Sequence, residues 1–195
     1  TGNRKIFQKE SWDIVYMYFS RSGKYRVLGI NQDAQTVIKV FDTTTERQIS
    51  FPKLPAGNVA SVSISKSEKL MSFYHGGAKS PSDLYAHTIG ERKYSRLTNS
   101  MNPEINPSYL AEAEVIRYKS FDGMEIPAVY YKPPNVKQGD KIPALVWVHG
   151  GPGGQSRVGY RALIQYLANH GYAVLAVNNR GSSGYGKTFQ TLDDQ

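Results

Sequence analysis

Short apolar segments separated by polar turns make up the first hundred residues of the chain. Each segment has four to six residues and is rich in β-branched or aromatic side chains. This pattern is typical of short antiparallel strands joined by turns. The predicted strands are residues 14–19, 25–30, 37–41, 48–51, 60–64, 70–74, 84–87 and 94–97.

An internal repeat organises these strands. Residues 20–24 (Ser-Arg-Ser-Gly-Lys) align with residues 65–69 (Ser-Lys-Ser-Glu-Lys) at an offset of 45, and the same offset places Glu46 on Glu91. A period of about 45 residues with four strands per unit is typical of β-propeller blades, so two blades are predicted. Because closed propellers have about four to eight blades, we expect further blades upstream in a longer chain. A small β-sandwich is the alternative, although the regular repeat favours a propeller.

The hydrophobic pattern changes at a segment with two Asn-Pro pairs, at residues 102–103 and 106–107. Such pairs favour turns, so we expect a linker here. The predicted division of the chain is residues 1–101 for the last blades of a β-propeller, 102–111 for the linker and 112–195 for the beginning of an α/β domain.

The last part of the chain contains the pattern of a βαβ unit. Residues 144–148 and 172–177 are apolar runs, as expected of parallel strands that are buried on both faces. Between them, Ser156 is the predicted N-cap of a helix and Gly171 the residue that ends it. The predicted apolar face of this helix consists of Tyr160, Leu163, Ile164 and Leu167. The predicted hairpin before this unit consists of residues 113–119 and 126–131 around the turn Asp122-Gly123. These elements predict a parallel α/β sheet.

The segment with the clearest chemical meaning is His149-Gly150-Gly151-Pro152, which follows the first apolar run. In α/β-hydrolases, a glycine-rich loop in this place donates a backbone N–H to the oxyanion that forms during acyl transfer. Glycine suits this role because the main chain must approach the substrate carbonyl closely. A glycine-rich turn that only connects a strand to a helix is the structural alternative.

A second segment, residues 179–186 (Asn-Arg-Gly-Ser-Ser-Gly-Tyr-Gly), follows the second apolar run. Together with His-Gly-Gly-Pro and the preceding repeat, it makes the chain resemble the prolyl oligopeptidase family of serine peptidases, which includes dipeptidyl peptidases and acylaminoacyl peptidases. The resemblance is strong over residues 114–189 and architectural before them. It implies β-propeller blades followed by the N-terminal part of an α/β-hydrolase domain.

The resemblance also implies roles for individual residues. Gly151 is expected to supply one backbone N–H of the oxyanion hole. The other implied site residues are His149, Gly150, Pro152 and Tyr185, which line or brace the site, and Arg180, which is structural. His149 is not expected to be the catalytic histidine, because α/β-hydrolases place that residue after the serine and the acid.

The chain contains no serine in the nucleophile-elbow pattern Gly-x-Ser-x-Gly. Around Ser183 the last place is Tyr185, and around Ser156 it is Val158. Since the acid and the histidine follow the serine, we expect the whole catalytic triad to be absent from this chain and to lie beyond Gln195. We therefore expect a truncated fragment that is inactive alone. Its incomplete parallel sheet should make it self-associate or need the remaining chain.

Composition narrows the remaining function classes. The chain has no cysteine, which excludes disulfides and thiol catalysis. Its net charge of +8 is spread along the sequence without a nucleic-acid-binding motif, so no nucleic-acid partner is expected. His75, His87 and His170 lack metal-ligand spacing, and neither a metal nor a cofactor is expected. No apolar run has the length of a membrane span or a signal peptide. The compartment is undetermined, although the absence of cysteine fits an exported bacterial protein.

These features predict a serine-type peptidase that hydrolyses short peptides through an acyl-enzyme. Two alternatives remain. One is a proline iminopeptidase- or esterase-like α/β-hydrolase, which the sequence His-Gly-Gly-Pro-Gly also suits. The other is a non-catalytic propeller used for binding. A Gly-x-Ser-x-Gly sequence beyond residue 195 would favour an enzyme over the binding module.

Overall fold

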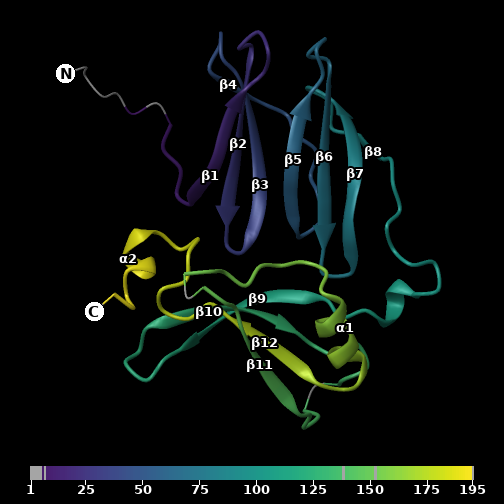
Figure 1. The fold of residues 1–195 in the computed structure, drawn as a ribbon, viewed down its shortest axis with the longest axis vertical. Coiled ribbons are helices and arrows are strands. Elements are labelled where there is room, and N and C mark those ends of the chain that lie inside the picture. Colours follow the sequence, from purple (N-terminus) through teal and green to yellow (C-terminus); the bar gives the residue numbers. More distant parts are fainter. Residues whose placement is uncertain (1–5, 7, 138, 152, 195) are drawn as a thin grey trace.

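The computed structural model describes residues 6, 8–137, 139–151 and 153–194 and contains three four-stranded sheets (Figure 1). Sheet 1 consists, in spatial order, of β1 (Asp13–Phe19), β2 (Tyr25–Gln32), β3 (Gln35–Asp42) and β4 (Arg47–Ile49). Sheet 2 consists of β5 (Asn58–Ile64), β6 (Leu70–Gly77), β7 (Ser80–Thr88) and β8 (Tyr94–Arg96). Sheet 3 has the order β11 (Ala144–Val148), β12 (Ala173–Val177), β10 (Glu125–Tyr131) and β9 (Ala113–Lys119). The helices are η1 (Pro107–Tyr109), α1 (Ala162–Asn169) and α2 (Lys187–Gln190).

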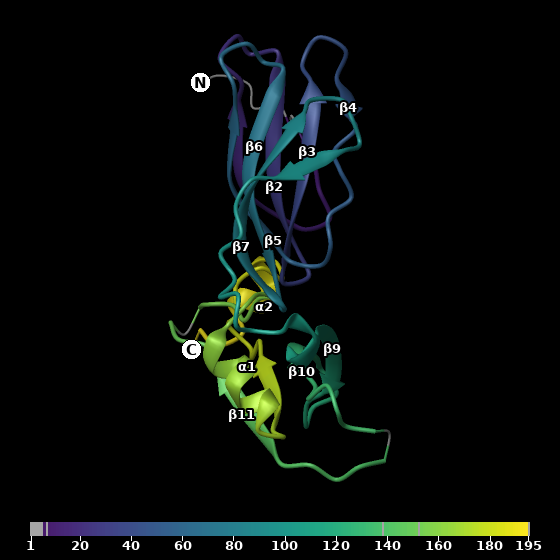
Figure 2. The same cartoon turned by 90° about the vertical axis from the view of Figure 1, so that its right-hand side faces the viewer.

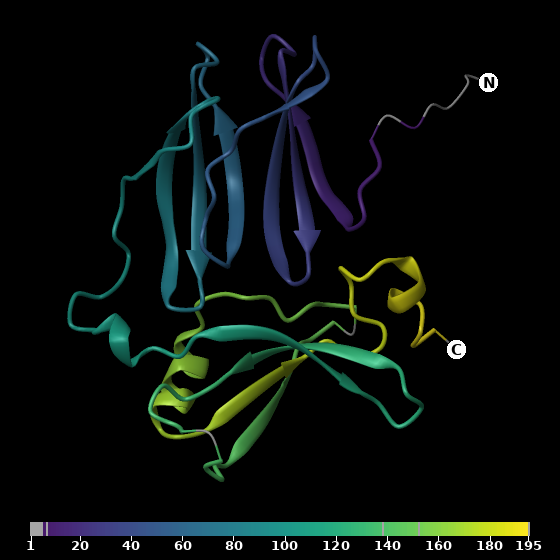
Figure 3. The same cartoon turned by 180° about the vertical axis from the view of Figure 1, so that it is seen from behind.

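Sheets 1 and 2 stand side by side above sheet 3, and the side view shows α1 and sheet 3 below both of them (Figures 1 and 2). Seen from behind, the connection from β8 descends beside sheet 2 and reaches sheet 3 through η1 (Figure 3). No helix among the described residues is long and apolar enough to cross a membrane.

The two upper sheets repeat one strand pattern. The first three strands of sheet 2 each begin 45 residues after their counterparts in sheet 1, which confirms the predicted repeat at the level of the strands. Both sheets are antiparallel, and both first strands carry a bulge, after Ile14 in β1 and after Ala60 in β5. Two four-stranded sheets in this order are consistent with neighbouring propeller blades.

An apolar core joins sheet 1 to sheet 2. Val27 and Val40 of sheet 1 lie in one cluster with Met71 and Phe73 of sheet 2, and none of the four is more than 2% exposed. The ring of Phe51, in the connection between the sheets, lies 5.3 Å from that of Phe73. Burying one such side chain stabilises the folded state by roughly 1.5–3 kcal/mol. This core therefore holds the two sheets against each other.

The opposite face of sheet 1 is covered by the residues that precede β1. Leu28, Ile30 and Phe41 are buried on this face, and Trp12 packs against them. The segment that ends at Trp12 thus occupies the position that a neighbouring sheet occupies on the other side.

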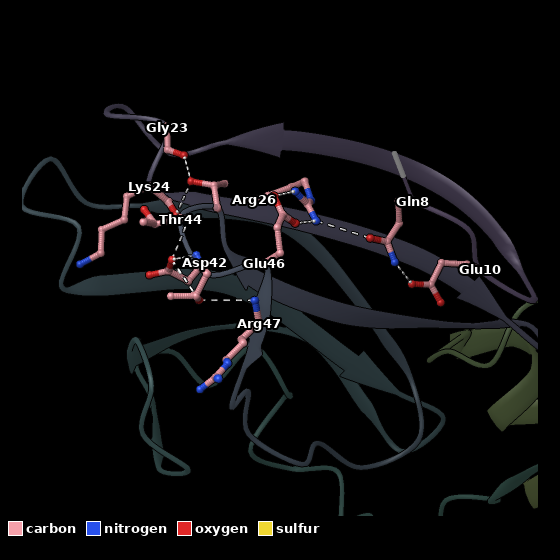
Figure 4. Close-up of polar contacts among 11 residues, drawn as sticks. Gln8, Glu10, Gly23, Lys24, Arg26, Asp42, Thr44, Glu46 and Arg47 are labelled. Atoms are coloured by element: carbon pink, nitrogen blue, oxygen red, sulfur yellow. Dashed lines mark hydrogen bonds and ion pairs between the residues drawn. The ribbon is translucent and has the colours of Figure 1, made fainter. Parts of the chain in front are cut away.

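A polar network continues this cover at the other end of the face (Figure 4). Arg26 is buried, and its guanidinium forms an ion pair with Glu46 at 2.8 Å and donates a hydrogen bond to Gln8 at 3.5 Å. Gln8 donates to Glu10 at 2.8 Å, and Glu10 pairs with Lys39 of β3 at 2.6 Å. These contacts attach residues 8–10 to sheet 1.

A second core lies between α1 and sheet 3. Ile164 and Ala168 of α1 pack with Val174 of β12, and the strands β11 and β12 are parallel, as predicted for a βαβ unit. Ala34, in the turn between β2 and β3, and Ala78, in the turn between β6 and β7, are buried in the same cluster. The ends of both upper sheets are therefore packed directly on the lower layer.

Two details of the predicted βαβ unit are wrong. The helix begins at Ala162 with Arg161 as its N-cap, not near Ser156, because contacts with sheets 1 and 2 hold residues 155–161 outside the helix. The buried face of α1 also differs from the predicted one, since Leu163 is 55% exposed and Gln165 is buried.

The predicted burial of residues 144–148 on both faces is wrong as well. Val146 and Val148 of β11 are 66% and 65% exposed. Within the described residues β11 pairs with β12 on one side and is the outer strand of sheet 3, so its second face has no cover.

Candidate active-site loops

The glycine-rich loop predicted to carry the chemistry follows β11 directly. Gly151 has a φ of 135°, and a Cβ at this position would meet the backbone nitrogens of Gly153 and Gly154. Both facts favour glycine at position 151. Gly150 and Gly151 are exposed, so their backbone is open to an approaching ligand. Pro152, the remaining predicted residue of this loop, lies outside the described residues.

A second loop, residues 178–186, follows β12 and is bonded to the first. The His149 Nε2 atom lies 2.8 Å from Ser182 Oγ, and the Ser183 N–H donates to the Gly154 carbonyl at 3.0 Å. The carboxyl ends of adjacent parallel strands meet at one edge of a sheet, and these two bonds hold the loops together there.

Both ring nitrogens of His149 have a polar partner. Its Nδ1 lies 3.1 Å from the Gly150 carbonyl, which can only accept, so Nδ1 carries the proton. Nε2 shares a hydrogen bond with the Ser182 hydroxyl. This is the chemical relation of a base to a serine nucleophile, but Ser182 is fully buried and out of reach of a substrate. The pair therefore braces the loop.

Asn178 connects the second loop to the segment after the first. Its side-chain oxygen accepts from the Ser156 N–H at 2.6 Å, and its amide donates to the Ser156 carbonyl at 3.0 Å. The same amide donates to the Tyr185 hydroxyl at 2.9 Å. The Tyr185 ring makes edge contacts with Trp12 at 6.2 Å and Phe189 at 5.5 Å, and burial raises the pKa of Tyr185. Tyr185 thus joins the loop to the segment before β1.

Arg180 reaches the turn between β9 and β10. It pairs with Asp122 at 2.5 Å, donates to Ser120 at 3.2 Å, and its guanidinium lies 5.2 Å from the centre of the Phe121 ring. Hydrogen bonds from the Met124 N–H and from Arg180 lower the pKa of Asp122. Arg180 therefore contacts the turn of the β9–β10 hairpin, which the sequence predicted.

A cavity of about 750 Å³ adjoins the glycine-rich loop. Gly153 lines it together with Asp13 and Ile14 from the start of β1, and Lys187 of α2 lines it as well. Sheet 1, the loop and α2 therefore line one cavity beside the candidate site.

The structure brings together most of the residues that the sequence singled out. His149, Gly150 and Gly151 share one loop, and Tyr185 lies in the loop bonded to it. The sequence reasoning did not single out Ser182 or Asn178 for this site. A signal existed for Asn178, because a polar residue directly after a buried strand stands where the loops of a parallel sheet begin.

Comparisons with known proteins agree with this geometry. Residues 158–193 match the model of the prolyl oligopeptidase family, peptidase S9. The chain is 32% identical over 155 residues to dipeptidyl peptidase family member 6 of Caenorhabditis elegans, and the aligned region covers 68% of this chain and 20% of that protein. It is 54% identical over 48 residues to dipeptidyl aminopeptidase BIII of Pseudoxanthomonas mexicana, and this aligned region covers 25% of this chain and 7% of that protein.

Among solved structures, an acylaminoacyl peptidase of Pyrococcus horikoshii superposes with a TM-score of 0.70 at 25% identity. The match covers 92% of this chain and 27% of that one. The chain therefore belongs to the prolyl oligopeptidase family of peptidases, and it spans about a fifth or less of the length of the two relatives named above.

Proposed function

We propose that these residues are part of a serine peptidase that cleaves short peptides through an acyl-enzyme. In this proposal the Gly151 N–H stabilises the oxyanion, and His149, Gly150, Pro152 and Tyr185 line or brace the loop. The nucleophile, acid and histidine belong to a part of the polypeptide outside these 195 residues, and the reaction needs no metal or cofactor. The 195 residues alone are inactive.

The observation that carries the proposal is the placement of the glycine-rich loop. It follows a parallel strand, its glycine backbone is exposed, and hydrogen bonds to the second loop hold it in place. Fixed backbone donors at the carboxyl edge of a parallel sheet are what stabilisation of a developing oxyanion requires. The dipeptidyl and acylaminoacyl peptidases named above support a peptide substrate.

The domain organisation follows from the same proposal. Residues 1–101 are the last blades of a propeller, 102–111 connect the domains, and 112–195 begin an α/β-hydrolase domain. The connection is partly built into the second core, since Ala111 is fully buried and bonds to Gln165 through its N–H at 2.7 Å and its carbonyl at 3.0 Å.

The test uses a longer polypeptide that contains these residues, with Gly151 replaced by Ala. The added Cβ and the positive φ should displace the oxyanion donor and lower kcat roughly 100-fold, with little change in KM. Gly139→Ala is the matched control, because Gly139 also has a positive φ but has open space around it. If both variants lose activity equally, or neither does, Gly151 has no role in catalysis.

A further inference from the structure

The segment between the glycine-rich loop and α1, residues 155–161, has neither helix nor strand structure. Contacts with sheets 1 and 2 hold it instead. The Val158 N–H donates to the Ala34 carbonyl at 3.0 Å, and the Val158 carbonyl accepts a hydrogen bond from the Asn58 side chain. The course of this segment is therefore set by the ends of both upper sheets.

Arg157 makes the largest set of these contacts. Its Nη2 donates to Thr36 Oγ1 at 2.6 Å and to Asn58 Oδ1 at 2.7 Å, and its Nε donates to Asn58 Oδ1 at 3.0 Å. Thr36 belongs to β3 of sheet 1 and Asn58 to β5 of sheet 2. One guanidinium thus bridges the two sheets and ties both to the segment.

The fixed fork of the guanidinium is what makes this bridge possible. Its acceptors here are neutral oxygens, and burial lowers the pKa of Arg157, but an arginine remains charged at any physiological pH. The planar group directs two nitrogens at Asn58 and Thr36 together. A lysine ammonium keeps the charge but cannot reproduce that geometry.

The bridge lies close to the glycine-rich loop along the chain. Gln155, two residues before Arg157, accepts from Asn31 Nδ2 at 2.8 Å and from Arg157 Nη1 at 3.5 Å. Gly154, the next residue toward the loop, is bonded to Ser183. Ser156, between Gln155 and Arg157, is bonded to Asn178 of the second loop through its N–H and its carbonyl. Each of the three residues between Arg157 and the loop thus has its own hydrogen bond, and a shift at Arg157 would strain this series of bonds and reach the loop through them.

We propose that Arg157 is a positioning residue that holds the glycine-rich loop in a fixed relation to both antiparallel sheets. This inference rests on the proposed function, because the loop is what that function requires to be fixed. Arg157 acts through Gln155 and the backbone, and it does not touch the reacting atoms.

A direct role in substrate binding is the competing explanation. Arg157 also lines a cavity of about 360 Å³, together with Thr36, Asn58 and Arg161. An arginine in that place could bind the terminal carboxylate of a peptide. The experiment must therefore separate positioning of the loop from binding of a carboxylate.

The experiment compares four variants of the full-length protein: Arg157→Lys, Thr36→Val, the double variant, and Arg161→Lys as a control for an exposed arginine in the same cavity. Peptide substrates with free and with amidated carboxyl ends are each assayed for kcat and KM. Hydrogen exchange of residues 149–156 is measured on the same samples, together with thermal unfolding.

Positioning predicts that Arg157→Lys lowers kcat roughly tenfold for both substrates, with KM within about twofold. It also predicts faster exchange in residues 149–156, and a double variant no worse than Arg157→Lys because the two groups share one bond. Arg161→Lys should change neither kcat nor exchange.

Three results would overturn the inference. A higher KM for the free carboxylate substrate alone would assign Arg157 to substrate binding. A lower Tm with unchanged kcat and unchanged exchange would make the bridge purely structural. If the wild-type protein hydrolyses no peptide, unchanged exchange in Arg157→Lys would reject both proposals, whereas faster exchange in Arg157→Lys would reject only the proposed function.

Discussion

Sheets 1 and 2 share their strand spacing but bury equivalent faces in different ways. In sheet 2, the face that carries Met71 and Phe73 packs against apolar side chains of sheet 1. The positions 45 residues earlier are Arg26 and Leu28, and they are covered by the segment that ends at Trp12. The repeat determines where the strands lie, whereas the neighbour of each face determines which side chains that face can bury.

The largest expected effect comes from exchanging the two equivalent residues. Met71→Arg would place a cation in an apolar core without a carboxylate partner, and it should lower the free energy of unfolding by about 3–5 kcal/mol. Arg26→Met should cost less than about 2 kcal/mol, because the Glu46 carboxylate that it leaves behind is 55% exposed and stays hydrated. Urea denaturation measures both, and equal losses would show that the two faces do not differ as described.

A smaller effect is expected from removing the cover of sheet 1. Trp12→Ala deletes the side chain that packs on Leu28, Ile30 and Phe41, and it should lower the free energy of unfolding by about 2 kcal/mol. Tyr109→Ala, at an exposed aromatic residue, is the control and should change it by less than about 0.5 kcal/mol. If the two variants unfold alike, residues 8–12 do not stabilise this face.

The smallest expected effect is a pH dependence of the unfolding free energy that comes from a buried carboxylate in sheet 2. Asp83 of sheet 2 is fully buried, and burial alone would raise its pKa, but hydrogen bonds from Arg96, Thr98 and Ser100 outweigh burial and lower the pKa to about 2. Asp83 pairs with His75 of β6, which lies 45 residues after Ile30 of β2. Ile30 pairs with Val37, so the position in sheet 1 that corresponds to Asp83 is the apolar Val37.

Because the folded pKa of Asp83 is below its unfolded value, its contribution is complete above about pH 4 and is lost as the pH falls toward 2. The expected contribution is about 1–2 kcal/mol. In Asp83→Asn the unfolding free energy should depend less on pH in this range, as followed by urea titrations from pH 5 to 2. An unchanged slope would contradict the lowered pKa.

Strand positions in the upper sheets could be predicted from the sequence because the information is local. Residues 20–24 and 65–69 are turns whose composition shows directly, and the same 45-residue spacing appears in the strands. The burial of β11 could not be predicted in the same way. A continuous apolar run indicates a buried parallel strand, but the strand or helix that covers it is a separate segment, and here β11 is an outer strand.

The candidate site was predictable only in part, for a similar reason. The glycines of the loop after β11 appear in the sequence, because a close backbone approach demands them at that place. The contacts that hold the loop do not appear, since Arg157 lies 99 and 121 residues from the partners it bridges. The N-cap prediction at Ser156 failed for this reason too, because contacts with the upper sheets keep residues 155–161 out of the helix.

The measurement that tests the central claim most directly is covalent labelling with a fluorophosphonate, which reacts with activated serine nucleophiles. The account predicts that a longer folded polypeptide containing these residues is labelled, that Gly151→Ala slows the labelling, and that residues 1–195 alone are not labelled. A folded longer polypeptide that resists the probe would contradict the assignment of a serine peptidase and would favour a non-catalytic role for the propeller-like sheets.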